Sequence, residues 1–515
     1  MTDPSPSTAE IGFHSVSETR RFLEQGATTS VELVETLLRR ISEADRAGPG
    51  LRAVLATCPD AIETARDLDA ERRQGMIRGP LHGIPALVKD NIDTAGSEGT
   101  TAGSLALAMT RPSNDAVAVR RMREAGVIVI AKSNLSEWAN FRGNNSSSGW
   151  SAVGGQCRNP HVLDRSPGGS SSGSGAGVAA GFAPISVGTE TDGSILCPAA
   201  LNGVVGIKPT VGLTSRTGVV PISSNQDTVG SMARSVVDAA ALLGVLAGGA
   251  EGSDHLDAVT TARPAGLPTD YTSFCSVNGL SGARIAVPRR HYFGYAPKAD
   301  AIVEAALDNA RGAGAVVIDA EVSTVEDIAQ SQDEMTVLLH ECQAGIEAYL
   351  VSRPAGRGQP RTLADIVAFN EEHASEELVF FGQELLIAAS QCGTLDDPAY
   401  IEARERNWQR ARQDGIDATL RSANADVLAF ATMGPAWCID HVNGDSHTRA
   451  GYQAAAVAGY PAISLPIGKV GELPVGLCLV ASAWAEPTLI RIAFAFEEML
   501  ALGTRLRPGW LAHSE

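Results

Sequence analysis

Glycine and serine gather in one charge-poor stretch of this sequence, and that stretch holds its clearest candidates for chemistry. Residues 166–177 consist of Gly and Ser apart from one Pro and one Ala, and Gly-Thr-Glu-Thr-Asp-Gly-Ser-Ile follows at 188–195. Glycine at this density is typical of a flexible linker, but core-forming apolar segments at 178–182 and 185–187 interrupt the run. A buried glycine-rich loop instead brings backbone N–H groups close to a ligand.

Two ligands would suit such N–H groups, a nucleotide phosphate and a tetrahedral oxyanion. A phosphate loop requires a lysine after the glycines, and no lysine lies between residues 133 and 207, which excludes it. The segment Thr191-Asp192-Gly193-Ser194 offers successive N–H groups and ends in a serine. A nucleophile beside its own oxyanion hole is the arrangement that acyl transfer needs.

A serine nucleophile needs a base. None of the ten histidines stands in an obvious triad or metal motif, so we expect no metal site. A lysine kept neutral by burial can replace histidine. Lys89 ends an apolar run flanked by turn residues, where a strand would deliver it to a cleft. From this segment alone, the alternative is a lysine at a strand end that pairs with Asp90 or Asp93.

The elements that position these residues follow an α/β pattern. Thr29 to Glu32 reads as a capping box before a helical pattern. A helix over 116–125, closed by Gly126, is followed at once by a β-branched strand that is expected to be buried on both faces. The same order recurs with a strand at 284–287, a helix over 299–313 and a strand at 316–318. This pattern favours a layered α/β fold with a parallel or mixed sheet.

Two regions depart from this pattern. Residues 150–235 are rich in Gly, Ser, Thr and Asn, whereas residues 325–425 are charged and helix-prone. No fixed repeat and no Pro- or Ser-rich linker divides the chain. We therefore expect one domain over 1–515, with a helical insertion around 325–425 acting as a cover.

Composition limits the classes of partner. The chain has 515 residues, 44% hydrophobic and 19% charged, and its net charge of −18 argues against binding nucleic acid or an anionic membrane. The segment 1–13 shows no secretory signal, and no run of 18 apolar residues appears. Eight widely spaced cysteines form no C-x-x-C pair. These features predict a cytoplasmic protein with free thiols.

Together, the segments 79–92, 166–177 and 188–194 resemble the amidase signature family of serine hydrolases in content, order and spacing. The resemblance extends from about residue 15 to 500 and is strongest over 79–235. It implies a mixed central sheet covered by helices on both faces, and a Ser–cis-Ser–Lys triad. By position, Lys89 would be the base, Ser170 the bridging serine held by a cis peptide, and Ser194 the nucleophile. The implied oxyanion donors are the N–H groups of Thr191, Asp192, Gly193 and Ser194.

Within the family, the segments 132–143, 188–195 and 434–445 are most similar to peptide amidase-like members, which remove the C-terminal amide of peptides. Asp192 stands where many members have glycine, and the peptide amidase-like members carry this aspartate. The resemblance therefore implies a short peptide or small-molecule amide as substrate and no cofactor, in a monomer or homodimer. Candidate substrate contacts are Asn140, Phe141 and Trp437, although the aromatic rings would serve equally as core, and Asn140 could instead stabilise its loop, as could Arg142.

Three alternatives stay open at this point. The first is the glutaminase subunit of an amidotransferase, which passes ammonia to a partner protein. The second is an amide-cleaving or amide-forming enzyme of specialised metabolism, because an acyl-enzyme can be captured by an amine instead of water. The third is a non-catalytic scaffold that kept the fold.

Overall fold

The computed structural model describes residues 10–96, 99–249, 252–354, 359–448, 450–502 and 506–509. Residues 1–9, on which most of the prediction of no secretory signal rests, lie outside these ranges. None of the helices within them is long and apolar enough to cross a membrane.

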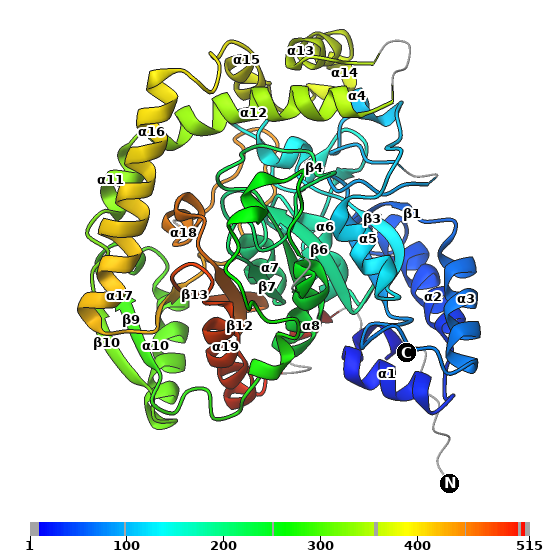
Figure 1. The fold of residues 1–515 in the computed structure, drawn as a ribbon, viewed down its shortest axis with the longest axis horizontal. Helices are drawn as coiled ribbons and strands as arrows, with labels where there is room; N and C mark the ends of the chain where they lie inside the picture. Colours follow the sequence, from blue (N-terminus) through cyan, green and yellow to red (C-terminus); the bar gives the residue numbers. More distant parts are fainter. Residues whose placement is uncertain are drawn as a thin grey trace.

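One mixed sheet of 11 strands crosses the molecule (Figure 1) in the order β1-β3-β2-β6-β8-β7-β12-β13-β11-β9-β10. The pairs β2–β3, β2–β6, β9–β10 and β9–β11 are parallel, and the remaining pairs are antiparallel. The strands of this sheet are β1 (Val54–Thr57), β2 (Pro85–Lys89), β3 (Ile128–Ser133), β6 (Ile185–Glu190), β7 (Val205–Lys208), β8 (Thr228–Ala233), β9 (Arg284–Pro288), β10 (Val316–Ala320), β11 (Val427–Ala431), β12 (Ala462–Val470) and β13 (Leu473–Val480). A separate hairpin joins β4 (Trp150–Ser151) to β5 (Gly155–Gln156).

Helices cover both faces of the sheet, as predicted. Ser186 of β6 donates a hydrogen bond to a carbonyl of α6, whereas Ser231, which lies opposite Val187 in β8, donates to a carbonyl of α8. Because neighbouring residues of a strand point to opposite faces, α6 and α8 lie on opposite sides. The helices before residue 320 are α1 (Val16–Glu24), α2 (Ser30–Ile41), α3 (Ala61–Arg73), α4 (Leu105–Ala108), α5 (Val117–Glu124), α6 (Ser172–Ala179), α7 (Leu196–Asn202), α8 (Val236–Ala247), α9 (Arg289–Tyr292) and α10 (Pro297–Gly312).

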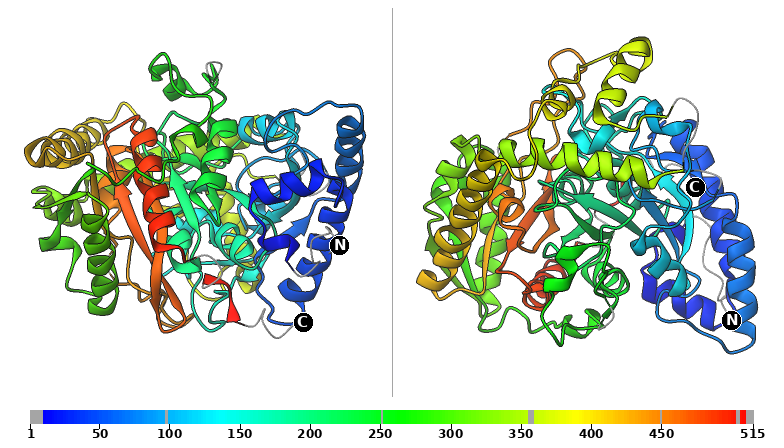
Figure 2. Two further views of the ribbon diagram at one scale, coloured as in Figure 1. Left: turned by 90° about the horizontal axis from the view of Figure 1, so that it is seen from below. Right: turned by 45° about the horizontal axis from the view of Figure 1, so that its top comes forward.

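The region from 325 to 423 contains helices and connecting segments, with no strand among its described residues, as the sequence predicts for the insertion. Figures 1 and 2 show that α12 lies across one edge of the molecule and that α16 runs down the adjoining side. We call this region the helical cover. Its helices are α11 (Val325–Gln330), α12 (Asp333–Ser352), α13 (Leu363–Glu372), α14 (Ala374–Glu377), α15 (Glu384–Ser390), α16 (Pro398–Trp408), a π-helical turn (Gln409–Ile416) and α17 (Asp417–Ala423). The chain ends with α18 (Gln453–Ala458) and α19 (Glu486–Leu500) around β12 and β13.

The predicted local elements form close to their expected bounds. Thr29 and Glu32 make the capping box of α2, and β3 is buried throughout. The strands at 284 and 316 pair in parallel around α10, which completes the predicted unit. One domain over 1–515 remains our prediction.

The glycine-serine run differs from the expected loop. Its second half forms α6, every residue of which is buried. A Cβ added at Gly173 would lie 2.1 Å from the Ala53 carbonyl oxygen, and one at Gly177 would lie 2.5 Å from Leu87. Much of the glycine content therefore serves the close packing of a buried helix rather than contact with a ligand.

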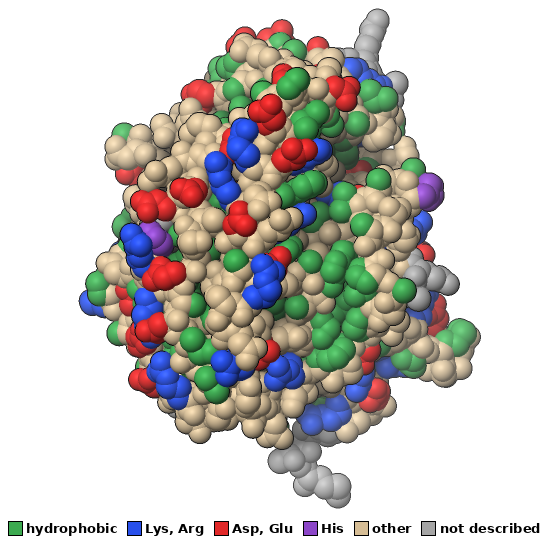
Figure 3. Space-filling view, turned by 60° about the vertical axis from the view of Figure 1, so that its left-hand side comes forward, with side chains coloured by type: hydrophobic (Ala, Val, Ile, Leu, Met, Phe, Trp, Pro, Cys, Tyr) green, Lys and Arg blue, Asp and Glu red, His purple; other side chains and the backbone are tan. Residues whose placement is uncertain are grey.

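One face of the molecule carries side chains of both charges. Figure 3 shows acidic and basic side chains interspersed over one face, without a field of single sign. The net charge of −18 is therefore not concentrated on that face.

Candidate active site

Strand β2 ends at Lys89 and places its ammonium group inside the molecule. The side chain is fully buried. Its Nζ lies 2.8 Å from Ser170 Oγ, 2.8 Å from Thr189 Oγ1 and 3.2 Å from the Thr189 carbonyl oxygen. Lys89 is therefore next to Ser170, as predicted from the resemblance, and the alternative pairing with Asp90 or Asp93 does not form.

The two aspartates near Lys89 have other partners. Asp90 lies 3.5 Å from Lys132 Nζ, and Asp93 accepts a hydrogen bond of 2.7 Å from the Tyr349 hydroxyl. Burial lowers the pKa of Lys89 to about 7, against the opposing charges of Asp227 and Glu190. A substantial fraction of Lys89 is thus neutral near pH 7, as a general base must be.

The two serines lie on segments joined by hydrogen bonds. The peptide bond between Gly169 and Ser170 is cis, as the resemblance implies. The next residue, Ser171, donates its backbone N–H to the Ser194 carbonyl at 3.0 Å. Ser194 is 7% exposed, whereas Ser170 is fully buried. In the described part of the chain, no hydrogen bond joins the two Oγ atoms, and such contacts often tighten only when substrate binds.

The segment 191–194 follows β6 directly, and Glu190 shapes it. One carboxylate oxygen of Glu190 accepts the N–H groups of Ile195 at 2.7 Å and Leu196 at 2.9 Å. The Gly193 N–H also donates to this carboxyl group. Within the described residues, no backbone carbonyl accepts the N–H groups of Thr191, Asp192 and Ser194, whereas the Gly193 N–H is bound by Glu190.

Gly193 occupies a position that only glycine fits. Its φ is +79°, in the left-handed region. A Cβ there would lie 2.1 Å from the Tyr452 ring. The ring therefore packs directly over the backbone of the segment and limits its movement.

Several residues around the site were not assigned a role from the sequence. Thr189 contacts Lys89, and Asn91 Nδ2 donates to Thr189 Oγ1 at 2.9 Å. Asp227 Oδ1 accepts the Thr191 hydroxyl at 2.6 Å. Thr189 and Thr191 flank Glu190 in the segment 188–195, but only the fold reveals their partners.

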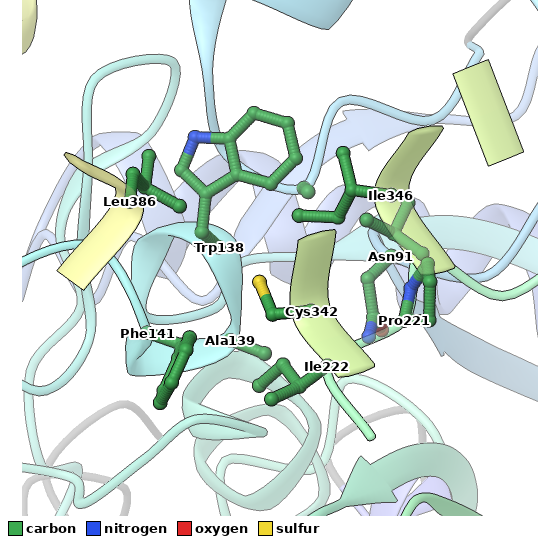
Figure 4. Close-up of a pocket in the computed structure, with 11 residues that line it drawn as sticks. Asn91, Trp138, Ala139, Phe141, Pro221, Ile222, Cys342, Ile346 and Leu386 are labelled. Atoms are coloured by element: carbon green, nitrogen blue, oxygen red, sulfur yellow. The ribbon is translucent and has the colours of Figure 1, made fainter. Parts of the chain in front are cut away.

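An apolar pocket adjoins these residues (Figure 4). Trp138, Phe141, Ile222, Cys342 and Leu386 line it, together with Asn91. A neighbouring small cavity shares Asn91 with this pocket and is also lined by Thr189 and Thr191. The pocket therefore lies beside the residues that contact Lys89, and α12 and α15 of the helical cover form one of its walls.

The predicted substrate contacts fall in different environments. Asn140 belongs to a left-handed turn with Trp138 and Ala139, with φ between 50° and 71°. Its Oδ1 is buried without a hydrogen-bond partner among the described residues, as are Trp138 Nε1 and Asn91 Oδ1. Phe141 lines the pocket.

Trp437 and Arg142 are held by the protein itself. The Trp437 indole donates to Asp445 Oδ1 at 2.9 Å, and its ring packs near Cys197. The guanidinium of Arg142 is fully buried and bonds to Glu137 and to the carbonyls of Glu377 and Phe381. Arg142 is therefore a structural link, the role that the sequence favours over substrate binding for this residue.

The site contains no obvious metal ligands. Among the described residues, no group of three His, Cys, Asp or Glu side chains could hold a metal ion. The eight cysteines, all of which lie in the described ranges, form no disulfide with one another.

Known proteins resemble this chain over most of its length. The family described as Amidase matches residues 32–490. A native peptide amidase from Stenotrophomonas maltophilia superposes with a TM-score of 0.90 at 48% identity, covering 95% of this chain and 97% of that one. A probable amidase of Arabidopsis thaliana is 37% identical over 503 residues, 96% of this chain and 91% of the relative. A glutamyl-tRNA(Gln) amidotransferase subunit of Symbiobacterium thermophilum is 34% identical over 496 residues, 94% of this chain and 96% of the relative.

Proposed function

This chain belongs to the amidase family, and we propose that, as an amide hydrolase, it removes the C-terminal amide of short peptides. The proposal rests on the three contacts of the buried Lys89 Nζ, which are Ser170 Oγ and the hydroxyl and carbonyl oxygens of Thr189. A neutral amine has two N–H donors and one lone pair. The two Thr189 oxygens accept the donors, and the lone pair is left facing the Ser170 hydroxyl.

The proposed reaction proceeds through an ester on Ser194. Ser194 Oγ attacks the amide carbon, and its proton passes through Ser170 to Lys89. The oxyanion is held by N–H groups of the segment 191–194 other than that of Gly193, which donates to Glu190, each such donor being worth about 3–4 kcal/mol. The C–N bond then breaks, and the proton on Lys89 returns through Ser170 to the departing nitrogen, which leaves as ammonia. Water cleaves the ester along the reverse proton path.

The substrate class is supported by the pocket and by the relatives. The pocket beside Thr189 is apolar, and Asn91, whose Oδ1 has no hydrogen-bond partner among the described residues, also lines it. The apolar lining matches the chemistry of an apolar side chain, and an amide oxygen matches the N–H donors of a peptide backbone. The 48% identity to a peptide amidase favours the same substrate over glutamine.

Ammonia release from a panel of amides tests the proposal. The panel holds C-terminally amidated dipeptides, glutamine, benzamide and a fatty acid amide, each with wild type and Ser194→Ala. We expect turnover of the dipeptide amides that disappears in the variant. Turnover of glutamine alone, dependent on a partner protein, would favour the glutaminase component of an amidotransferase. No turnover and no labelling of Ser194 by a serine-directed phosphonate would refute amide hydrolysis at this site.

A further inference from the structure

A buried carboxylate outside the proposed triad joins two segments of the site. Asp227 precedes β8 and is 8% exposed. Its Oδ1 accepts the Thr191 hydroxyl at 2.6 Å. Its Oδ2 accepts the backbone N–H groups of Ile222 at 2.8 Å and Ser223 at 2.9 Å. We call residues 191–194 the proposed oxyanion segment. The Asp227 carboxylate therefore joins Thr191, its first residue, to Ile222, which lines the apolar pocket.

Asp227 also lies close to the surroundings of Lys89. It lines the small cavity that Thr189, Thr191 and Asn91 share. Thr189 is the residue that contacts Lys89 Nζ through two oxygens. Asp227 therefore contacts Thr191 and lines the same cavity as Thr189, the residue that contacts Lys89.

The charges around these groups are few. The acidic groups that face Lys89 are Asp227 and Glu190, and both favour its protonated form. The charged groups that face Asp227 are Lys89 and Arg216, and Arg216 is itself paired with Asp257 at 2.6 Å. The titratable thiol of Cys342, from α12, also faces Asp227. Burial raises the pKa of Asp227 to about 6, while its hydrogen bonds and Arg216 oppose the rise. Asp227 is therefore mainly ionised near pH 7.

We propose that Asp227 is a positioning residue of this amidase, which aligns the oxyanion segment through Thr191 and whose negative charge acts on Lys89. The inference rests on the proposed function, since it assumes that Lys89 is the base and that the segment 191–194 holds the oxyanion. Asp227 does not touch the substrate in this scheme. Instead, it positions the backbone whose N–H groups contact the oxyanion. Its negative charge also raises the pKa of Lys89 above the value that burial alone would give.

Two substitutions separate these two effects. Thr191→Val removes the hydroxyl donor and keeps the charge of Asp227. We expect kcat to fall by about 10- to 100-fold, with KM little changed, because a small misplacement of an aligned group costs this much. Asp227→Asn removes the charge but also replaces one acceptor oxygen by an NH2 donor, so only the position of the acid limb is read from this variant. Since an opposite charge raises the pKa of a lysine, its loss should move the acid limb of kcat/KM down by about 1 pH unit.

Asp254→Asn is the matched control. Asp254 is also 8% exposed and accepts the hydroxyls of Ser215 at 2.6 Å and Thr217 at 2.5 Å. Neither Thr191 nor Lys89 is among its hydrogen-bond partners. We expect this variant to leave the acid limb in place even if it unfolds at a lower temperature.

The outcomes distinguish a failure of the proposed function from a failure of the role inferred for Asp227. If Lys89→Ala keeps full activity on dipeptide amides, the proposed function fails. If Lys89→Ala is inactive while Thr191→Val has wild-type kcat, the positioning role of Asp227 is refuted. An acid limb that stays in place in Asp227→Asn, or that moves as far in Asp254→Asn, would refute the effect of its charge on Lys89. Should Asp227→Asn not fold, the kcat of Thr191→Val decides the inference.

Discussion

Residues 79–235, where the family resemblance is strongest, and the helical cover contribute to the site in different ways. We call residues 79–235 the signature core. Its strands β2, β3, β6, β7 and β8 are buried at every residue. The long helices of the cover bury only part of their surface, and α16 buries only Tyr400, Ala403 and Asn407. All three proposed triad residues belong to the core, whereas the cover supplies one wall of the apolar pocket.

Polar side chains join the two regions. From α12, Glu334 accepts Gln226 Nε2 at 2.9 Å, and Gln226 in turn donates to the Thr191 carbonyl at 3.4 Å. Further along α12, Glu341 bonds to Ser223 and Asn225. These contacts place the cover against the oxyanion segment and the chain that leads to β8.

A third link runs in the opposite direction. Arg142 of the core reaches into the cover and bonds to the carbonyls at 377, 381 and 382. Its ring partners are Phe381 and Trp150, with the guanidinium carbon 3.9 Å and 5.1 Å from their centroids. The core thus holds the three proposed triad residues, and the cover, joined to it by a few buried polar links, forms part of the pocket wall.

The largest expected effect lies in the core. Lys89→Ala should lower kcat by about 10⁴-fold or more, because residues of a proton-relay triad act as a unit. The measurement is ammonia release from a dipeptide amide. Lys132→Met is the matched variant, since Lys132 is equally buried but bonds to Ile92, Thr94 and Thr100. It should lose stability and keep most of its activity; equal inactivation of both variants would argue against a special role for Lys89.

The next effect concerns the link between the two regions. Arg142→Ala leaves Glu137 and Glu377 buried without their cation and should cost about 3–5 kcal/mol of the free energy of unfolding. Denaturant titration measures this loss. Arg20→Ala removes an exposed ion pair within α1 and should cost less than about 1 kcal/mol. Similar losses in both variants would mean that Arg142 is not a main attachment of the cover.

The pH dependence tests the core without a substitution. Because the pKa of Lys89 is lowered to about 7, the neutral base becomes populated as the pH rises through 7. Below this midpoint, kcat/KM should fall by about tenfold per pH unit. Arg406 lowers the pKa of Asp333 in the cover to about 2, so Asp333→Asn should not move this limb. Activity that stays flat down to pH 5 would contradict a neutral Lys89.

The smallest expected effect follows from removing the Tyr349 hydroxyl, which joins the cover to the core. Tyr349→Phe removes the hydroxyl that donates to Asp93 at 2.7 Å and accepts from Arg353 at 2.7 Å. We expect a loss of about 1–2 kcal/mol of stability, with kcat within error of wild type. Val351→Ala, on the exposed face of α12, should change neither quantity. A large fall in kcat for Tyr349→Phe would mean that the cover also influences the chemistry.

Local sequence patterns predicted much of this architecture. The capping box at Thr29, the buried strand at 128–133 and the parallel pair around α10 depend on periodicity and end signals that operate within a few residues. The glycine-serine run was misjudged because glycine suits both a loop and a crowded helix. Only the contacts of Gly173 with Ala53 and Asn134 distinguish the two.

By its resemblance to the amidase signature family, the sequence predicted the residue types and order of the proposed site, from Lys89 through Ser170 to Ser194, because the motifs that carry the resemblance are short local stretches of sequence. Only the tertiary structure shows that Thr189 contacts Lys89 and that Asp227 accepts a hydrogen bond from Thr191. It also shows that Arg142 bonds to the carbonyl of Glu377 in the cover. These pairings join residues 36 to 235 positions apart. A hydrogen bond depends on distance in space, and chain separation carries no information about it until the sheet and its helices bring the partners together.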